Sequence, residues 1–112
     1  MGEENNLYEI FIDSIKENNE LWLLKAFDGL YAMLEDNTGQ EYIPVWNSKQ
    51  KALDFAGEDW EGYSADSMKI YEFVNWLKEL DNDEVMIAVS PGEDMHTIPI
   101  KASDIMKHLK ES

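Results

Sequence analysis

The sequence predicts a single α+β domain spanning residues 1–112, in which helices pack on a sheet of about five largely antiparallel strands. Two observations support this prediction: stretches of β-compatible residues are separated by turn residues, and apolar residues recur at helical spacing in other segments. The predicted order, α-β-β-β-α-α-β-β-α, favours an antiparallel or mixed sheet over a doubly wound one. No linker rich in Pro, Gly or Ser divides the 112 residues, a length typical of one domain.

The N-terminal third is predicted to form a helix followed by a hairpin. Apolar residues at helical spacing predict the helix over residues 5–18. A strand is predicted over 20–27 and a second apolar stretch covers 30–34. Asp28 and Gly29 lie between them, and Asp-Gly in this position favours a tight hairpin turn with positive φ at both central residues.

A second turn at residues 36–39 leads into a strand predicted over 41–46. Pro44 in that strand has no amide hydrogen to donate, so the strand is expected at an edge of the sheet, or bulged at that position. Asn47, with a glutamine three residues later, resembles a capping box that opens a helix. Gly57 is expected to end this helix.

The C-terminal half is predicted to contain two helices and two strands. After a loop over residues 58–64, the clearest amphipathic pattern in the chain predicts a helix over 66–80. Strands are predicted over 84–90 and 96–100. Ser103 is expected to cap a short final helix.

The charge of the chain restricts its partners. It has 24 Asp and Glu residues against nine lysines and no arginine, a formal net charge of −15. Such a surface repels nucleic acids and anionic membranes and attracts basic partners, so we expect a basic protein partner, no nucleic acid and no membrane. The apolar runs are shorter than the ~18 residues of a membrane span, and the first residues lack the pattern of a signal peptide. We therefore expect a cytoplasmic protein.

Little in the sequence points to catalysis. Cysteine is absent and there are two histidines, His96 two residues after Asp94 and His108 four residues after Asp104. Both spacings occur often by chance, so no metal and no cofactor are expected. Motifs for phosphate loops, dinucleotide binding, zinc proteases and Ser nucleophiles are also absent. Enzymatic activity is therefore uncertain, and the balance favours a protein that is not an enzyme.

Three carboxylates form an acidic stripe on the first predicted helix. Glu9, Asp13 and Glu17 are four residues apart, so they lie along one helix face despite their mutual repulsion. The stripe is either a solvated helix face in a chain that is acidic throughout, or a docking surface for a lysine-rich partner.

A second candidate surface is a loop in which aromatic residues stand among acids. An exposed Trp and Tyr ringed by carboxylates can receive a cationic side chain through charge and cation–π contact. Alternatively, the two rings cover the core and the acids point into solvent. Trp22 and Trp76 are expected in the core, as is Trp46, which also belongs to the candidate binding residues. The candidate binding residues are Trp46, Glu58, Asp59, Trp60, Glu61 and Tyr63.

Two short motifs, Pro44-Val45-Trp46 and Trp60-x-Gly62-Tyr63, are specific in their residues and in their separation. Together with the other elements they make the chain resemble an uncharacterised bacterial family, the domain of unknown function 2750. The likeness extends from about Tyr8 to Leu109. The resemblance implies a small bacterial cytoplasmic α+β domain, and it supplies no activity and no catalytic residues.

Two functions follow as hypotheses. The first is a non-enzymatic protein-interaction module, of immunity or adaptor type, that binds a basic partner through its acidic surface; immunity proteins are similar to it in size and charge. The second is a small-ligand binder or enzyme with a pocket near Trp46, Trp60 and Tyr63. The sequence does not specify an oligomeric state.

Overall fold

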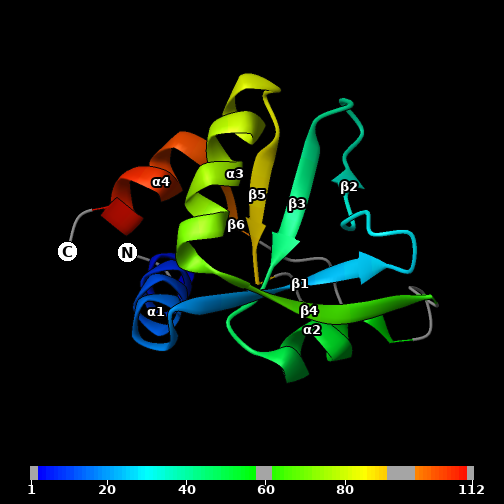
Figure 1. Ribbon diagram of the computed structural model, residues 1–112. Helices are drawn as coiled ribbons and strands as arrows, with labels where there is room; N and C mark the ends of the chain where they lie inside the picture. The colour runs from blue at the N-terminus through cyan, green and yellow to red at the C-terminus, as the bar shows by residue number, and fades with distance from the viewer. Residues whose placement is uncertain (1–2, 58–61, 91–97, 111–112) are drawn as a thin grey trace.

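Two small sheets and four helices make up the part of the chain that the structure describes (Figure 1). The computed structural model describes residues 3–57, 62–90 and 98–110. The elements are α1 (Glu3–Asn18), β1 (Glu20–Ala26), β2 (Leu34–Glu35), β3 (Glu41–Val45), α2 (Lys49–Ala56), β4 (Tyr63–Lys69), α3 (Ile70–Asn82), β5 (Met86–Val89), β6 (Ile98–Lys101) and α4 (Ala102–Lys110). The predicted α+β class is confirmed.

The sheet arrangement differs from the prediction of one sheet of about five strands. β1 and β4 form an antiparallel pair, and the other strands form a four-stranded sheet in the order β2-β3-β5-β6. In this second sheet β3 and β5 are parallel, while the other two pairs are antiparallel. Trp22 of β1 and Trp46, just after β3, exchange two backbone hydrogen bonds of 2.8 and 2.9 Å. This single bridge joins the two sheets.

β4 is a strand that the sequence analysis missed. Residues 63–69 were expected to lie in a loop and in the first turn of a helix, but they pair with β1 along seven residues, from Tyr63 opposite Ala26 to Lys69 opposite Glu20. The helix that follows, α3, begins only at Ile70. The segment has few β-branched or aromatic residues, so its conformation depends on the ladder that β1 offers rather than on local propensity.

The first predicted hairpin is also only partly formed. Gly29 reverses the chain, but residues 30–34 pair with β1 at one bridge, Lys25 opposite Tyr31, which consists of two backbone hydrogen bonds. The chain then leaves β1, and β2 pairs with β3. Asp28 does not have positive φ, so the predicted two-residue turn is wrong; a three-residue turn stands in its place.

Pro44 lies in an interior strand, contrary to the edge prediction. β2 is so short that it pairs only with Glu41 and Tyr42, so it ends before Pro44. Val45 accepts a hydrogen bond of 2.8 Å from Ser90, so its backbone groups face β5, and those of Pro44 therefore face away from it. The missing amide hydrogen thus removes no bond between β3 and β5.

Two helix caps differ from the prediction. Ser48, not Asn47, caps α2: its side chain accepts a hydrogen bond of 3.2 Å from the Lys51 amide. Gly57 ends α2 at a φ of +48°, as predicted. α4 begins at Ala102, so Ser103 lies inside the helix that it was expected to cap.

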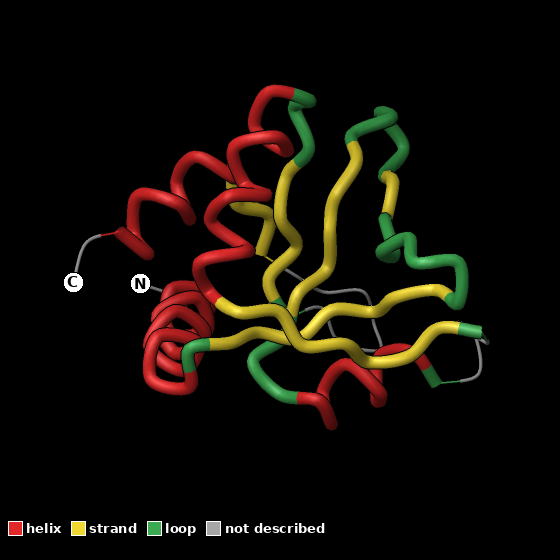
Figure 2. Tube along the Cα trace, viewed as in Figure 1, coloured by secondary structure: helices red, strands yellow, loops and turns green. Residues whose placement is uncertain are grey.

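The core consists of two hydrophobic clusters. α1, α3 and α4 gather on one side of the molecule and supply most of the first cluster, with Phe11, Phe73 and Ile105 among its members (Figure 2). α2 lies on the other side of the β1–β4 pair and packs Phe55 against Trp46 in the second cluster. The core prediction is right for Trp46, whereas Trp22 and Trp76 are only partly buried. Within the described residues, no helix has the length and apolarity needed to cross a membrane.

Candidate functional site

The acidic stripe lies on the exposed face of α1. Glu9, Asp13 and Glu17 are all exposed, while Phe11 and Ile15 on the opposite face are buried in the first cluster. The helix therefore separates its charges from its core contacts as its sequence predicts. This exposure fits both a solvated face and a docking surface.

A hollow of about 520 Å³ lies beside the stripe, between α1 and α4. Tyr8 and His108 close one part of it through a hydrogen bond between the Tyr8 hydroxyl and Nδ1 of His108. Burial, with the charge of Asp104 as a second cause, raises the pKa of Tyr8 to about 12. We call this the α1–α4 hollow; its lining is Tyr8, Glu9, Ile12, Asp13, Lys16 and His108.

The acid-ringed loop is described only at its end. Glu58, Asp59, Trp60 and Glu61 lie outside the described residues, as do Asp94 and His96. Tyr63 is partly buried against the second cluster, and Trp46 at the centre of that cluster is only 1% exposed. The ring of Trp46 therefore packs in the core and offers no face to a ligand. No group of three or more His, Asp or Glu side chains among the described residues is arranged to hold a metal ion.

Another surface that the sequence analysis did not single out is markedly apolar. It is a hollow of about 630 Å³ that opens between the β1–β2 connection, β4 and α3, with Ile43 of β3 at its base. We call it the apolar hollow. Its side chains are Leu30, Tyr31, Met33, Ile43, Met68 and Trp76.

The β1–β2 connection is held firmly enough to present these side chains. Its backbone makes three hydrogen bonds of 2.8 to 2.9 Å with the end of β1 or within the turn, and Ala32 is buried in the second cluster. Because successive side chains of an extended segment point to opposite sides, burying Ala32 turns Tyr31 and Met33 toward the hollow. Leu30 is 68% exposed, Met33 42% and the neighbouring Phe27 96%.

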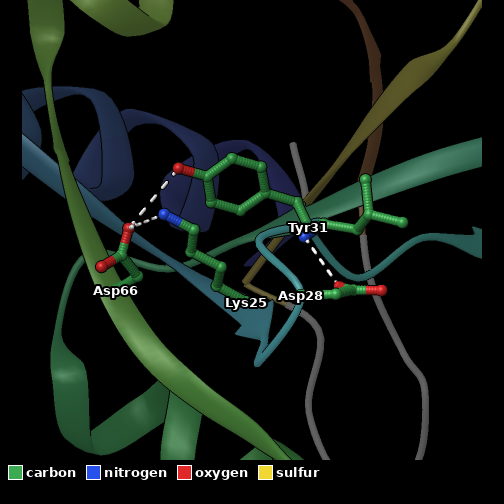
Figure 3. Close-up of polar contacts among 5 residues, drawn as sticks. Lys25, Asp28, Tyr31 and Asp66 are labelled. Atoms are coloured by element: carbon green, nitrogen blue, oxygen red, sulfur yellow. Dashed lines mark hydrogen bonds and ion pairs between the residues drawn. The ribbon is translucent and has the colours of Figure 1, made fainter.

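A polar corner borders the apolar hollow (Figure 3). The Tyr31 hydroxyl donates to Oδ2 of Asp66 at 3.4 Å, and the Lys25 ammonium lies 4.0 Å from the same oxygen. Lys25 Nζ is also 5.5 Å from the centre of the Tyr31 ring, within the range of a cation–π contact. The centre of the Tyr31 ring also lies 5.0 Å from that of the Trp76 ring.

Negative charge dominates this corner. Burial raises the pKa of Tyr31, and the charge of Asp66, its hydrogen bond and the charge of Glu72 on α3 raise it further. Asp28, on the turn beside the hollow, accepts a hydrogen bond of 3.1 Å from the Leu30 amide. The carboxylate of Asp66 therefore pairs with Lys25, while those of Glu72 and Asp28 act on the adjacent residues Tyr31 and Leu30.

Comparison with protein families gives one match. The model of the family described as "Protein of unknown function (DUF2750)" matches residues 8–109, nearly the whole chain. The chain belongs to this family. The resemblance drawn from the Pro44-Val45-Trp46 and Trp60-x-Gly62-Tyr63 elements is thus confirmed. No curated protein matches the chain.

Within this DUF2750 chain, one sequence signal could have indicated the apolar hollow. Tight turns favour Gly, Asn, Asp and Ser, yet Phe27 precedes Asp28-Gly29 and Leu30 follows it. Because Phe27 and Leu30 also fit the ends of the two predicted strands, their exposure was not expected. No sequence signal indicated that Met68 and Trp76 line the hollow, because their positions depend on how β4 and α3 pack.

Proposed function

We propose that this protein is a non-enzymatic interaction module, of immunity or adaptor type, that binds a basic protein partner through the apolar hollow. The observation that supports this most is the exposure of Leu30 and Met33 in the lining of the hollow, with Phe27 exposed on the same well-anchored turn as Leu30. Scattered exposed apolar residues are ordinary, but a grouped set beside a hollow is typical of protein-binding surfaces.

The surrounding charge supports a basic partner. Asp28 and Asp66 accept hydrogen bonds from Leu30 and Tyr31, which line the hollow, and the charge of Glu72 acts on Tyr31. The chain as a whole has a net charge of −15. A second copy of this chain would bring the same carboxylates and the same net charge to the contact. Complementary charge accelerates association and disfavours partners of like sign, so a surface rich in Lys or Arg fits best.

The acidic stripe has a supporting role in this proposal. Glu9, Asp13 and Glu17 are exposed, and they add to the long-range field that draws a basic protein toward the domain. Exposed charges are screened beyond ~8–10 Å at physiological salt, so this attraction weakens as salt is added. The apolar hollow contributes the part of the contact that salt does not screen.

The test is co-purification from the source cells with three baits: the wild type, Leu30→Asp and Leu53→Asp. Leu53, 41% exposed on α2, is outside the hollow, so Leu53→Asp is matched to Leu30→Asp in chemistry and charge. We expect a Lys- or Arg-rich protein to be retained by the wild type and by Leu53→Asp, released by moderate salt, and lost from Leu30→Asp. The loss would occur although Leu30→Asp makes the bait more acidic, so it cannot come from weaker electrostatic attraction.

Two results would contradict the proposal. One is that no basic protein is enriched at low ionic strength by the wild type. The other is that the same protein is retained equally by both variants, which would mean that charge alone captures it. Thermal melts of both variants confirm that they remain folded.

A further inference from the structure

The polar corner beside the apolar hollow holds a lysine in unusually loose geometry. Lys25 Nζ lies 4.0 Å from Oδ2 of Asp66, at the outer limit of an ion pair, and its side chain is 38% exposed. Its cation–π contact with Tyr31, at 5.5 Å, is also near the outer limit. An exposed pair at this distance contributes little to folding, so Lys25 can leave the corner at little cost.

The groups that Lys25 contacts form a recognition site for a cation. Asp66 supplies a carboxylate that is 40% exposed, and the same oxygen is positioned by the Tyr31 hydroxyl. Tyr31 supplies a ring face, and Trp76, which also lines the hollow, lies 5.0 Å from that ring between ring centres. Figure 3 shows the Lys25 ammonium and the Tyr31 hydroxyl both directed at Asp66. A carboxylate beside an aromatic face is the combination that binds lysine or guanidinium side chains.

The apolar hollow begins where this cation site ends, because Tyr31 belongs to both. A ligand that fills the two together must place a cationic group beside an apolar side chain. Leu30 and Met33 then contact the apolar part, while Asp66 and the nearby charge of Glu72 attract the cation.

We propose that Lys25 occupies the place of a partner's cation, and that the site binds a peptide segment in which a Lys or Arg stands next to a Leu-like residue. That the segment belongs to a basic protein rests on the proposed function. The partner's cation takes the position at Asp66 and Tyr31, Lys25 moves into solvent, and the apolar side chain enters the hollow.

The test compares Lys25→Gln with a matched control, Lys69→Gln. Lys69 pairs with Glu20 at 3.9 Å, at the opposite end of the same β1–β4 ladder, so both variants remove one positive charge and one loose ion pair. The probe is a capped synthetic peptide of alternating Lys and Leu, measured by calorimetry at low ionic strength. We expect Lys25→Gln to strengthen binding about threefold or more, and Lys69→Gln by less than about twofold, because only Lys25 competes with the ligand's cation.

Further measurements test the cation site and the apolar hollow independently. Asp66→Asn should weaken binding of the Lys-Leu peptide, and oligolysine of equal charge should bind more weakly than the Lys-Leu peptide. The indole N–H signal of Trp76, assigned with Trp76→Phe, should shift on addition of the Lys-Leu peptide and remain unchanged with a Glu-Leu peptide. Thermal melts check that each variant is folded.

The outcomes distinguish this inference from the proposed function. If Leu30→Asp abolishes binding but Lys25→Gln and Lys69→Gln behave alike, the hollow is a docking site and the role of Lys25 is refuted. If Lys-Leu and oligolysine peptides bind equally and Leu30→Asp has no effect, the hollow itself is refuted. Concentration-dependent dimerisation of the free protein that Leu30→Asp abolishes would instead identify the occupant as a second copy of the chain.

Discussion

Two turns in this protein share one backbone conformation and differ in whether their side chains are polar or apolar. In the first turn, the Ala26 amide donates a hydrogen bond to the Leu30 carbonyl, and the Gly29 amide donates one to the Ala26 carbonyl. In the second turn, the backbone amide of Asp36 donates to the Gln40 carbonyl, and the Gly39 amide donates to the backbone carbonyl of Asp36. In both turns glycine is the last of the three loop residues, and its φ is +92° at Gly29 and +89° at Gly39. We call them the Gly29 turn and the Gly39 turn.

The Gly39 turn is closed by its own side chains. Both carboxylate oxygens of Asp36 accept hydrogen bonds, from the amide and hydroxyl of Thr38, from the amide of Gln40 and from the hydroxyl of Tyr42. These bonds lower the pKa of Asp36 to about 2, and the bonds from the Thr38 and Tyr42 side chains have the largest effects.

The Gly29 turn instead exposes large apolar side chains, and its Asp28 accepts a hydrogen bond from Leu30. Because a fully polar sequence satisfies the same backbone at the Gly39 turn, the turn geometry does not require Phe27 or Leu30. Leu30 lines the apolar hollow beside the turn, which explains its presence, whereas Phe27 in the same turn is 96% exposed. This difference is why we assign binding to one turn and a structural role to the other.

The largest expected effect concerns the support beneath the Gly29 turn. Trp46→Ala should lower the free energy of unfolding by about 3–5 kcal/mol, because it removes the largest side chain of the second cluster. Ala32 belongs to that cluster, so the amide of Ala32 should also lose hydrogen-exchange protection more than that of Gln40. Urea unfolding and amide exchange measure both. Equal loss of protection at the two amides would show that the Gly29 turn does not depend on the cluster.

A smaller change in the free energy of unfolding tests whether the two turns have the same backbone conformation. Gly29→Ala and Gly39→Ala should each cost about 1–2 kcal/mol, because an L side chain is strained at these φ values. An added Cβ would have no neighbour within 4 Å at Gly29 and would be 3.7 Å from Glu35 at Gly39, so steric clash adds nothing at either position. Urea unfolding of both variants measures the costs. Clearly unequal costs would mean that the turns differ in backbone as well as in side chains.

The smallest effect depends on pH and belongs to the Gly39 turn alone. The pKa of Asp36 is lowered on folding, so its contribution to stability is complete above its usual pKa of about 3.8 and is lost as the pH falls toward 2. The stability difference between the wild type and Asp36→Asn should therefore shrink between pH 4 and pH 2. Urea midpoints at several pH values measure it. A difference that stays constant over this range would contradict the role of Asp36.

Much of the fold could be predicted from local pattern. The helical spacing around Phe11 and Ile15 gave α1 nearly in full, and Gly57 marked the end of α2. β4 could not be found in this way, because residues 63–69 carry no strong strand signal and are held by pairing with β1. The paired residues are 37 to 49 positions apart, a long-range contact that a short sequence window does not contain.

The candidate site was predicted less well than the fold. The exposure of the stripe, Glu9, Asp13 and Glu17, followed from helical periodicity and is observed. The apolar hollow was not predicted, since Leu30, Met68 and Trp76 come from three separate elements. Trp46 was placed both in the core and in a binding pocket, and only its burial between α2 and β1 decided for the core.

The sequence by itself determined the α+β class, the acidic surface and the family, because composition, periodicity and short motifs are properties of the chain in order. The tertiary structure decided that β1 pairs with β4, that Ala32 is buried, and that Tyr31 consequently faces Asp66 and Trp76. The physical reason is that burial of one small residue in an extended segment fixes where its neighbours point. The net charge of −15 indicates which partners to expect, and the packing around Tyr31 indicates where one of them would bind.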